Sequence, residues 1–143
     1  MLAILRECMV CRLALCDETQ PYVVPLNFGY AESNGALTLW FHCAKEGRKL
    51  DIIRANPEAA FECDVPSELI GGTEACGFTM KYVSVLGNEH VVVCTEDEEK
   101  RAGLAALMAH YAPGRAFSIP QAALNGVCVL RLDVKTVSGK RHR

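Results

Sequence analysis

The chain has 143 residues, of which 50% are hydrophobic and 22% are charged, and its formal net charge at pH 7 is -2. This length and composition are typical of one folded domain, residues 1–143, and exclude a disordered chain. Lysines and arginines are scattered apart from FHCAKEGRKL and the tail SGKRHR, so no broad basic face for duplex nucleic acid is expected.

The sequence indicates neither a membrane protein nor a secreted one. No apolar run reaches the ~18 residues that a membrane span requires. The N-terminal MLAILRECMVCRLAL carries Arg6, Glu7 and Arg12 where a signal peptide would have an apolar stretch and a cleavage site. We therefore expect a cytoplasmic protein. Its eight cysteines are expected to be reduced thiols, because a domain of this size does not need disulfides for stability.

The first part of the chain predicts strands joined by tight turns. VCRLALC (10–16) is a predicted strand, and PYVVPLNFGY (21–30) alternates apolar and polar residues like a strand with one buried face. Pro25 cannot donate to a strand ladder, so we expect this strand at a sheet edge or bulged. Asn34-Gly35 predicts a hairpin turn into ALTLWFH, where His42 falls on the face opposite the aliphatic residues.

The remaining elements favour an antiparallel sheet. They are a helix over 45–56, a strand over 58–65, a long hairpin over 78–94 turning near Gly87-Asn88, a helix over 96–111 and a strand over 127–137. About six strands joined mostly by hairpins, with two helices, predict a mainly β (α+β) fold, a six-stranded antiparallel β-barrel with peripheral helices. A doubly wound parallel sheet is disfavoured, because no GxGxxG or Walker-type loop occurs.

The second predicted helix follows every local rule. Glu96 to Glu99 place negative charge on its first turn, where the helix dipole favours it, and Thr95 with Glu98 predicts a capping box. An apolar stripe then faces the core, formed by Leu104, Leu107, Met108 and Tyr111.

The first predicted helix breaks the charge rule, because Lys45, Arg48 and Lys49 gather at its start. A bound anion would compensate for them. The free N–H groups of the first turn and the cationic side chains suit a phosphate, and Gly47 allows it to approach the backbone closely. The alternative is a solvated basic face whose charges pair with Glu46 and Asp51.

Four segments in order resemble a known family. VCRLALC, QPYVVPLNFGY, LWFHCAKEGRKLDIIRANPEAAFECD and YVSVLGNEHVV resemble the FMN-binding split-barrel proteins of the pyridoxamine 5'-phosphate oxidase-like superfamily, above all their nitroimidazole-resistance branch. The resemblance covers nearly the whole chain. It is most specific in the pattern HxAKEGxKLDxxxxNP, from His42 to Pro57, and in YxSVxG, from Tyr82 to Gly87.

This resemblance implies a split β-barrel that forms a homodimer, with one FMN in each of two clefts at the subunit interface. The residues implied at the cofactor are Val24, Pro25, Leu26 and Asn27 against the isoalloxazine ring, His42, Ala44, Lys45, Arg48 and Lys49 near the phosphate, and Tyr82, Ser84 and Gly87 along the cleft. Which of the three cations contacts the phosphate stays open. Cys43 departs from the family pattern, since a small residue such as glycine or serine is expected there.

The function implied is an FMN-dependent oxidoreductase that reduces a small aromatic or nitro compound. The flavin would carry the redox chemistry, and His42 is the candidate catalytic residue, expected to contact the cofactor or substrate unless it caps the helix. The alternatives are a non-catalytic flavin or small-ligand binding protein and a haem-binding relative. No metal site is expected, because the Cys8 and Cys11 pair lacks a second pair of ligands.

Overall fold

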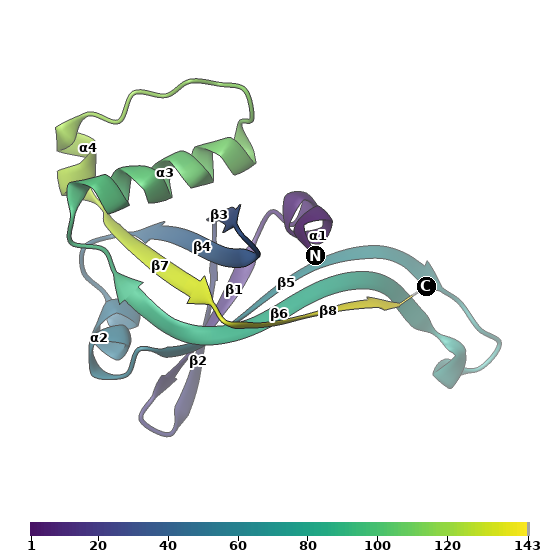
Figure 1. Cartoon of the computed structure of the whole chain (residues 1–143). Helices are drawn as coiled ribbons and strands as arrows, with labels where there is room; N and C mark the ends of the chain where they lie inside the picture. The colour runs from purple at the N-terminus through teal and green to yellow at the C-terminus, as the bar shows by residue number, and fades with distance from the viewer. Residues whose placement is uncertain (143) are drawn as a thin grey trace.

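The computed structural model describes residues 1–142 and consists of an antiparallel sheet with helices around it (Figure 1). Its helices are α1 (Leu2–Glu7), α2 (Arg48–Ala55), α3 (Asp97–Tyr111) and α4 (Gln121–Gly126), with a short 3-10 turn at Ala75–Gly77. Its strands are β1 (Cys11–Asp17), β2 (Gln20–Leu26), β3 (Phe28–Ser33), β4 (Ala36–Cys43), β5 (Glu58–Ile70), β6 (Thr79–Val93), β7 (Cys128–Val134) and β8 (Thr136–His142). The predicted fold class, an α+β split barrel, is confirmed.

The eight strands follow the order β2-β1-β5-β6-β7-β4-β3, with β8 paired to β6 outside this path. Strands β2 and β3 are the two ends of the path, so the sheet is not closed. The end position of β2 confirms that the strand containing Pro25 lies at an edge, where a residue without an N–H is tolerated.

The sheet has eight strands rather than about six. While the predicted hairpin over 78–94 is a single strand, two of the predicted strands are each divided in two. The first divides at Asn27, so that β2 pairs with β1 and β3 pairs with β4. The last divides at Lys135, so that β7 pairs with β4 and β8 pairs with β6. The alternation of apolar residues continues across Asn27, and it therefore gave no sign of a break.

The predicted hairpin turn at Gly87-Asn88 is wrong, because β6 runs through it as one strand of 15 residues. Gly87 lies opposite Phe61 on β5. A Cβ at Gly87 would lie 2.5 Å from the Phe61 ring and 2.7 Å from the carbonyl oxygen of Thr136. The glycine is therefore needed for close packing between β5, β6 and β8 rather than for a turn.

The barrel interior is filled by aliphatic and aromatic side chains from almost every strand. Those that are fully buried include Leu13, Phe28, Leu39, Phe41, Phe61, Leu130 and Leu132, and Leu5 of α1 is buried among them. A second, smaller core lies between α3 and the outer face of β4 and β7, where Trp40, Cys94, Leu107 and Val129 are buried. The predicted stripe on α3 is confirmed, because Leu104, Leu107, Met108 and Tyr111 all pack in this second core.

The predicted capping box of α3 is wrong. The helix begins at Asp97 with Glu96 as its N-cap residue, so Thr95 lies one position too early to cap it. The Thr95 hydroxyl instead donates to the Glu96 carboxylate at 3.3 Å. The predicted negative charge is present, with Asp97, Glu98 and Glu99 in the first turn.

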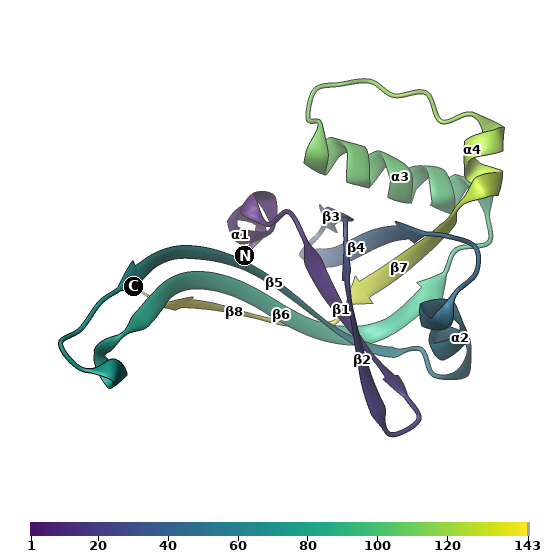
Figure 2. The same cartoon turned by 180° about the vertical axis from the view of Figure 1, so that it is seen from behind.

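Strands β5, β6 and β8 extend beyond the barrel as a long curved arm, seen from both sides in Figures 1 and 2. A register shift between Pro66 and Glu68 interrupts the pairing of β5 with β6 within this arm. Apolar side chains toward the far end are exposed, with Leu69 at 61%, Phe78 at 54% and Met80 at 42%.

The structure also bears on membranes, metals and disulfides. None of the helices in residues 1–142 is long and apolar enough to cross a membrane. In the same part of the chain, no group of three or more His, Cys, Asp or Glu side chains is placed to hold a metal ion. All eight cysteines are free thiols.

Candidate functional site

The start of α2 is the first part of the candidate site. The helix begins at Arg48, so the predicted start at Lys45 is wrong by one turn. Gly47 is the N-cap residue. Its φ of 133° is not helical, so α2 cannot extend through Gly47 toward the N-terminus. The Gly47 carbonyl accepts from the N–H groups of Leu50 and Asp51 at 2.9 and 3.3 Å, and no side chain of the described residues caps the helix. The first N–H groups of α2 are therefore available to a ligand.

The basic residues at this start have different surroundings. Arg48 pairs with Asp17 at 3.1 Å, and its guanidinium lies 5.2 Å from the centre of the Tyr22 ring. Lys45 is exposed and Lys49 is half-buried, and within residues 1–142 neither has an ion-pair partner. The two lysines thus differ from Arg48 in carrying uncompensated positive charge.

The proposed alternative of pairing with Glu46 and Asp51 does not describe these lysines. Asp51 pairs with Arg54 at 3.3 Å on the same helix. Both members of that pair are exposed, so it contributes little to stability.

Arg48 connects this helix start to the hairpin of β1 and β2, because it pairs with Asp17 at the end of β1 and lies over the ring of Tyr22 on β2. Val24 and Leu26 are half-buried and pack on the barrel core, while Pro25 and Asn27 are exposed on the other face. Because β2 is an end strand of the sheet, one side of its backbone has no strand partner. Within one chain, the contact of Arg48 with Tyr22 therefore links the helix start to the strand that carries the residues predicted at the ring.

His42 lies at the end of β4 on the face opposite the barrel interior, as the alternation of the sequence predicted. Its side chain is exposed and borders a cavity of ≈ 220 Å³ under the segment between α3 and α4. The other residues around this cavity are mostly apolar: Leu104, Leu107, Met108, Phe117, Ser118, Ile119 and Ala123. The imidazole thus faces α3, whereas the next residue, Cys43, packs with the barrel core.

Cys43 is half-buried and lies directly opposite Cys128 on β7. Burial, together with the neighbouring Cys128, raises the pKa of the Cys43 thiol to about 11, although the positive charge of Lys49 acts in the opposite direction. The thiol is therefore protonated at neutral pH.

The predicted site residues of β6 lie apart from this group, because β1 and β5 stand between β2 and β6. Tyr82 stacks on His142 of β8, with ring centres 6.0 Å apart and an interplanar angle of 8°. Ser84 is buried at 6% exposure, and Gly87 packs against Phe61. One chain therefore does not bring all the predicted residues together.

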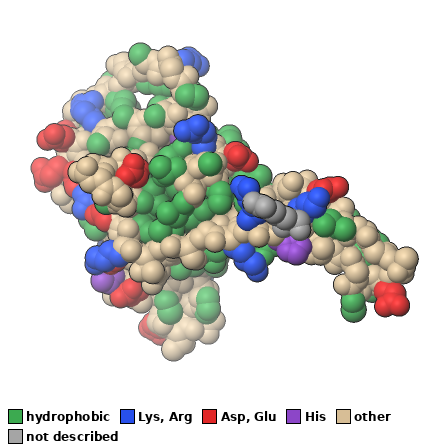
Figure 3. Space-filling model, turned by 45° about the vertical axis from the view of Figure 1, so that its right-hand side comes forward, with side chains coloured by type: hydrophobic (Ala, Val, Ile, Leu, Met, Phe, Trp, Pro, Cys, Tyr) green, Lys and Arg blue, Asp and Glu red, His purple; other side chains and the backbone are tan. Residues whose placement is uncertain are grey.

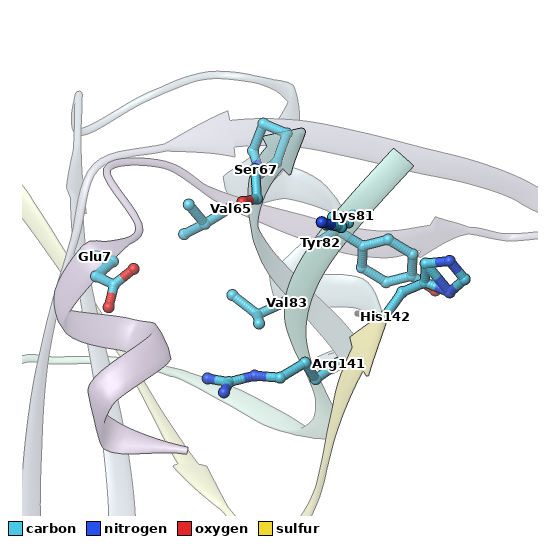
Figure 4. Close-up of a pocket in the computed structure, with 9 residues that line it drawn as sticks. Glu7, Val65, Ser67, Lys81, Tyr82, Val83, Arg141 and His142 are labelled. Atoms are coloured by element: carbon cyan, nitrogen blue, oxygen red, sulfur yellow. The ribbon is translucent and has the colours of Figure 1, made fainter. Parts of the chain in front are cut away.

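A pocket of ≈ 430 Å³ lies where α1 meets the arm, near Tyr82 (Figure 4). Val65, Val83 and Arg141 point toward α1 in this view, where Glu7 faces them. Sequence reasoning missed Glu7, Lys81 and Arg141 as lining residues. Arg141 reaches the pocket through the pairing of β8 with β6, and Glu7 reaches it through the packing of α1 on β5 and β6, and no sequence motif announces either contact.

Comparison with known proteins connects this geometry to a family. A family model described as "Pyridoxamine 5'-phosphate oxidase" matches residues 1–141. A candidate 5-nitroimidazole antibiotic resistance protein from Bacteroides thetaiotaomicron is 29% identical with a TM-score of 0.83, over 96% of this chain and 80% of its own. Comparison with curated proteins gives no match.

Two more distant structures share the fold. The FAD and haem binding protein from Mycobacterium smegmatis has a TM-score of 0.85 at 19% identity, over 98% of this chain and 68% of its own. The flavocytochrome Anf3 from Azotobacter vinelandii has a TM-score of 0.81 at 17% identity, over 99% of this chain and 65% of its own. Since the family match spans 1–141 and includes both the start of α2 and the β6 arm, the chain belongs to the pyridoxamine 5'-phosphate oxidase family.

Proposed function

We propose that this protein binds FMN and works as an oxidoreductase of the nitroimidazole-resistance type, which reduces a small aromatic or nitro compound. The observation that carries the proposal is the start of α2. Among residues 1–142 it has no side-chain cap, and its two lysines have no ion-pair partner. Membership of the family and the likeness to a candidate nitroimidazole resistance protein support it.

The start of α2 fits one phosphate group. Nothing lies within 4 Å of the position that a Cβ of Gly47 would occupy, so an anion can approach the backbone there. The first N–H groups of the helix would donate to phosphate oxygens, and the positive end of the helix dipole favours their charge. Lys45 and Lys49 would neutralise the remaining charge. FMN carries one phosphate, which a site of this kind would bind.

The bound flavin would supply electron and hydride transfer. The chain would hold and orient it, with the free edge of β2 along the ring and the exposed Pro25 and Asn27 on the outer face. His42 would donate a hydrogen bond to a bound substrate, because its imidazole is exposed beside an apolar cavity of a size suited to a small aromatic ring.

The proposed site needs two copies of the chain. The group formed by α2 and β2 and the group on β6 are separated within one chain, and a homodimer would join one copy's α2 to the other copy's arm. The exposed apolar side chains of Leu69, Phe78 and Met80 support this, because such surface on an extended arm is typical of an interface. Figure 3 shows a larger hydrophobic group at the base of the arm and further hydrophobic side chains toward its end.

The test is the visible absorption spectrum of the purified protein, recorded again after incubation with FMN and removal of the excess. We expect flavin bands in the wild type and about tenfold to hundredfold weaker FMN binding in Lys49→Ala, as for loss of a charged hydrogen bond. Glu98→Ala, at the start of α3, is the matched control and should retain FMN. A protein that stays colourless after incubation would overturn the proposal. Chromatography of the released cofactor distinguishes FMN from FAD.

A non-catalytic flavin or haem binding protein is the second candidate, favoured by the exposed His42 beside an apolar cavity and by the shared fold with a haem-binding protein. A flavin carrier would retain FMN but would not turn over with any pair of electron donor and acceptor. A haem protein would show a Soret band on haem addition, and His42→Ala would weaken it.

A further inference from the structure

Two pairs of cysteines span neighbouring strands of the sheet. Cys43 on β4 lies directly opposite Cys128 on β7. Cys11 on β1 and Cys63 on β5 lie next to the paired residues Arg12 and Glu62 in the same antiparallel register. The proposed flavin chemistry uses neither pair.

The position of Cys43 and Cys128 meets the distance requirement of a disulfide. Residues directly opposite each other in an antiparallel pair have Cα atoms about 4.5 or 5.5 Å apart. Both values lie within the range of about 4.4 to 6.8 Å that disulfides span. Cys43 is the last residue of β4 and Cys128 is the first of β7, so a small backbone adjustment would disturb no ladder beyond them.

The two pairs differ in access to solvent. Cys43 is half-buried and can be reached by a small oxidant, while Cys128 behind it is 8% exposed. Cys11 and Cys63 are both fully buried at 0%. An oxidant in solution therefore reaches the first pair in the folded protein and the second pair only when the barrel opens.

We propose that Cys43 and Cys128 are a modification site, at which a low-molecular-weight disulfide oxidises the two thiols to an intramolecular disulfide. The Cys43 thiolate attacks one sulfur of the oxidant, forming a mixed disulfide and releasing one thiolate. The Cys128 sulfur then attacks the Cys43 sulfur of the mixed disulfide. This step forms the protein disulfide and releases the second thiolate. The two protein thiols lose two electrons and two protons, and the oxidant is reduced to two thiols.

The surroundings of Cys43 make this reaction slow at neutral pH and faster in alkaline solution. Burial and Cys128 raise the pKa of the Cys43 thiol, and Lys49 of α2 partly offsets them. The bond would join β4 to β7 directly before the loop 44–47, which leads into the start of α2. The reaction itself does not depend on the proposed binding of flavin.

The experiment treats the reduced full-length protein with oxidised glutathione at mildly alkaline pH, alkylates the remaining thiols and maps the peptides by mass spectrometry without reduction. We expect a peptide pair joined through Cys43 and Cys128, which dithiothreitol separates again. The pair joined through Cys11 and Cys63 should be absent while the protein stays folded, as circular dichroism would verify.

Three variants make the result specific. In Cys128→Ser, Cys43 should stop at the mixed disulfide with glutathione, whereas in Cys43→Ser the crosslink should be lost. Cys16→Ser is the matched control, because Cys16 is also half-buried but has no cysteine opposite it, and it should leave the crosslink intact. A wild-type protein in which Cys43 stays as a mixed disulfide, or stays unmodified while the exposed Cys76 reacts, would overturn the proposal.

Discussion

The two longest helices begin in opposite ways. The first turn of α3 carries Asp97, Glu98 and Glu99, which suit the positive end of the helix dipole. Two of these acids are also bound, because Glu99 pairs with Arg131 of β7 and Asp97 accepts from the Gln121 side chain at 2.7 Å. The first turn of α2 contains Arg48 and Lys49 beside Asp51, and its cap, Gly47, provides no side chain.

Helix α2 forms in spite of this start because its other face is buried. Leu50, Ile52 and Ile53 are between 0% and 3% exposed in the barrel core. Burial of three such side chains contributes several times more than the few tenths of a kcal/mol by which each cation opposes the dipole. The comparison separates two roles: the start of α3 is used within the fold, while the start of α2 is left free for a ligand.

The largest expected effect on stability is at α3. Gly29→Ala would place a Cβ into the backbone of Ala106 and Leu107 on α3. We expect the free energy of unfolding to fall by about 3 kcal/mol, because backbone on both sides must move. Gly126→Ala is the control, since nothing lies within 4 Å of its Cβ position, and it should change stability by less than about 0.5 kcal/mol. Equal urea midpoints for the two variants would contradict this close packing.

A smaller effect is expected at the cap of α2. Gly47→Ala introduces no overlap, but it forces a side chain into a φ of 133°. We expect stability to fall by about 1 to 2 kcal/mol from backbone strain. FMN binding should weaken as well, because the first N–H groups of the helix must shift. Gly29→Ala, in contrast, should leave the affinity of the folded fraction for FMN unchanged. Fluorescence titration of FMN together with urea unfolding measures both quantities.

The sequence alone predicted much of this contrast. The acidic and basic starts, the buried stripe of α3 and the edge position of β2 all follow from local patterns, because charge placement, helical spacing and proline each act over a few residues. The helix starts were less certain. Because Gly47 is the N-cap residue, α2 begins at Arg48 and not at the predicted Lys45. The N-cap residue of α3 is Glu96, one position after Thr95, so the predicted capping box does not form.

Long-range pairing could not be predicted. Gly87-Asn88 reads as a turn, and only the contact with Phe61 and Thr136 explains why a straight strand needs that glycine. The tail SGKRH lacks apolar alternation, so its pairing with β6 and the pocket at Arg141 were missed. For the candidate site, family motifs supplied residue positions, but the separation of β2 from β6 follows from strand order, which no local pattern encodes.

Exchanging the charges of the two helix starts should change stability in opposite directions. Lys49→Glu in the flavin-free protein is expected to raise the free energy of unfolding by about 0.3 to 1 kcal/mol, because a negative charge then suits the dipole. Glu98→Lys should lower it by a similar amount. High salt should reduce both differences, since it screens exposed charges. The same sign for both variants at low salt would show that the charges at α2 do not oppose its dipole.

The smallest expected effect is on the reaction rate of Cys43. It tests whether the positive charge of Lys49 acts on neighbouring groups in the absence of flavin. Burial and Cys128 hold the pKa of Cys43 at about 11, and Lys49 acts to lower it. The reaction of Cys43 with a small disulfide should therefore accelerate about tenfold for each pH unit up to about pH 10, because only the thiolate attacks.

Lys49→Ala should slow the reaction of Cys43 about twofold to fourfold at a given pH, since the thiolate loses a neighbouring positive charge. The measurement needs a background in which Cys16 and Cys76, the other thiols with access to solvent, are serine. Glu98→Ala should leave the rate unchanged, because Glu98 is not among the groups that shift the pKa of the Cys43 thiol. If Lys49→Ala left the rate equally unchanged, the charge at the start of α2 would be fully screened by water, and a phosphate would gain little from it.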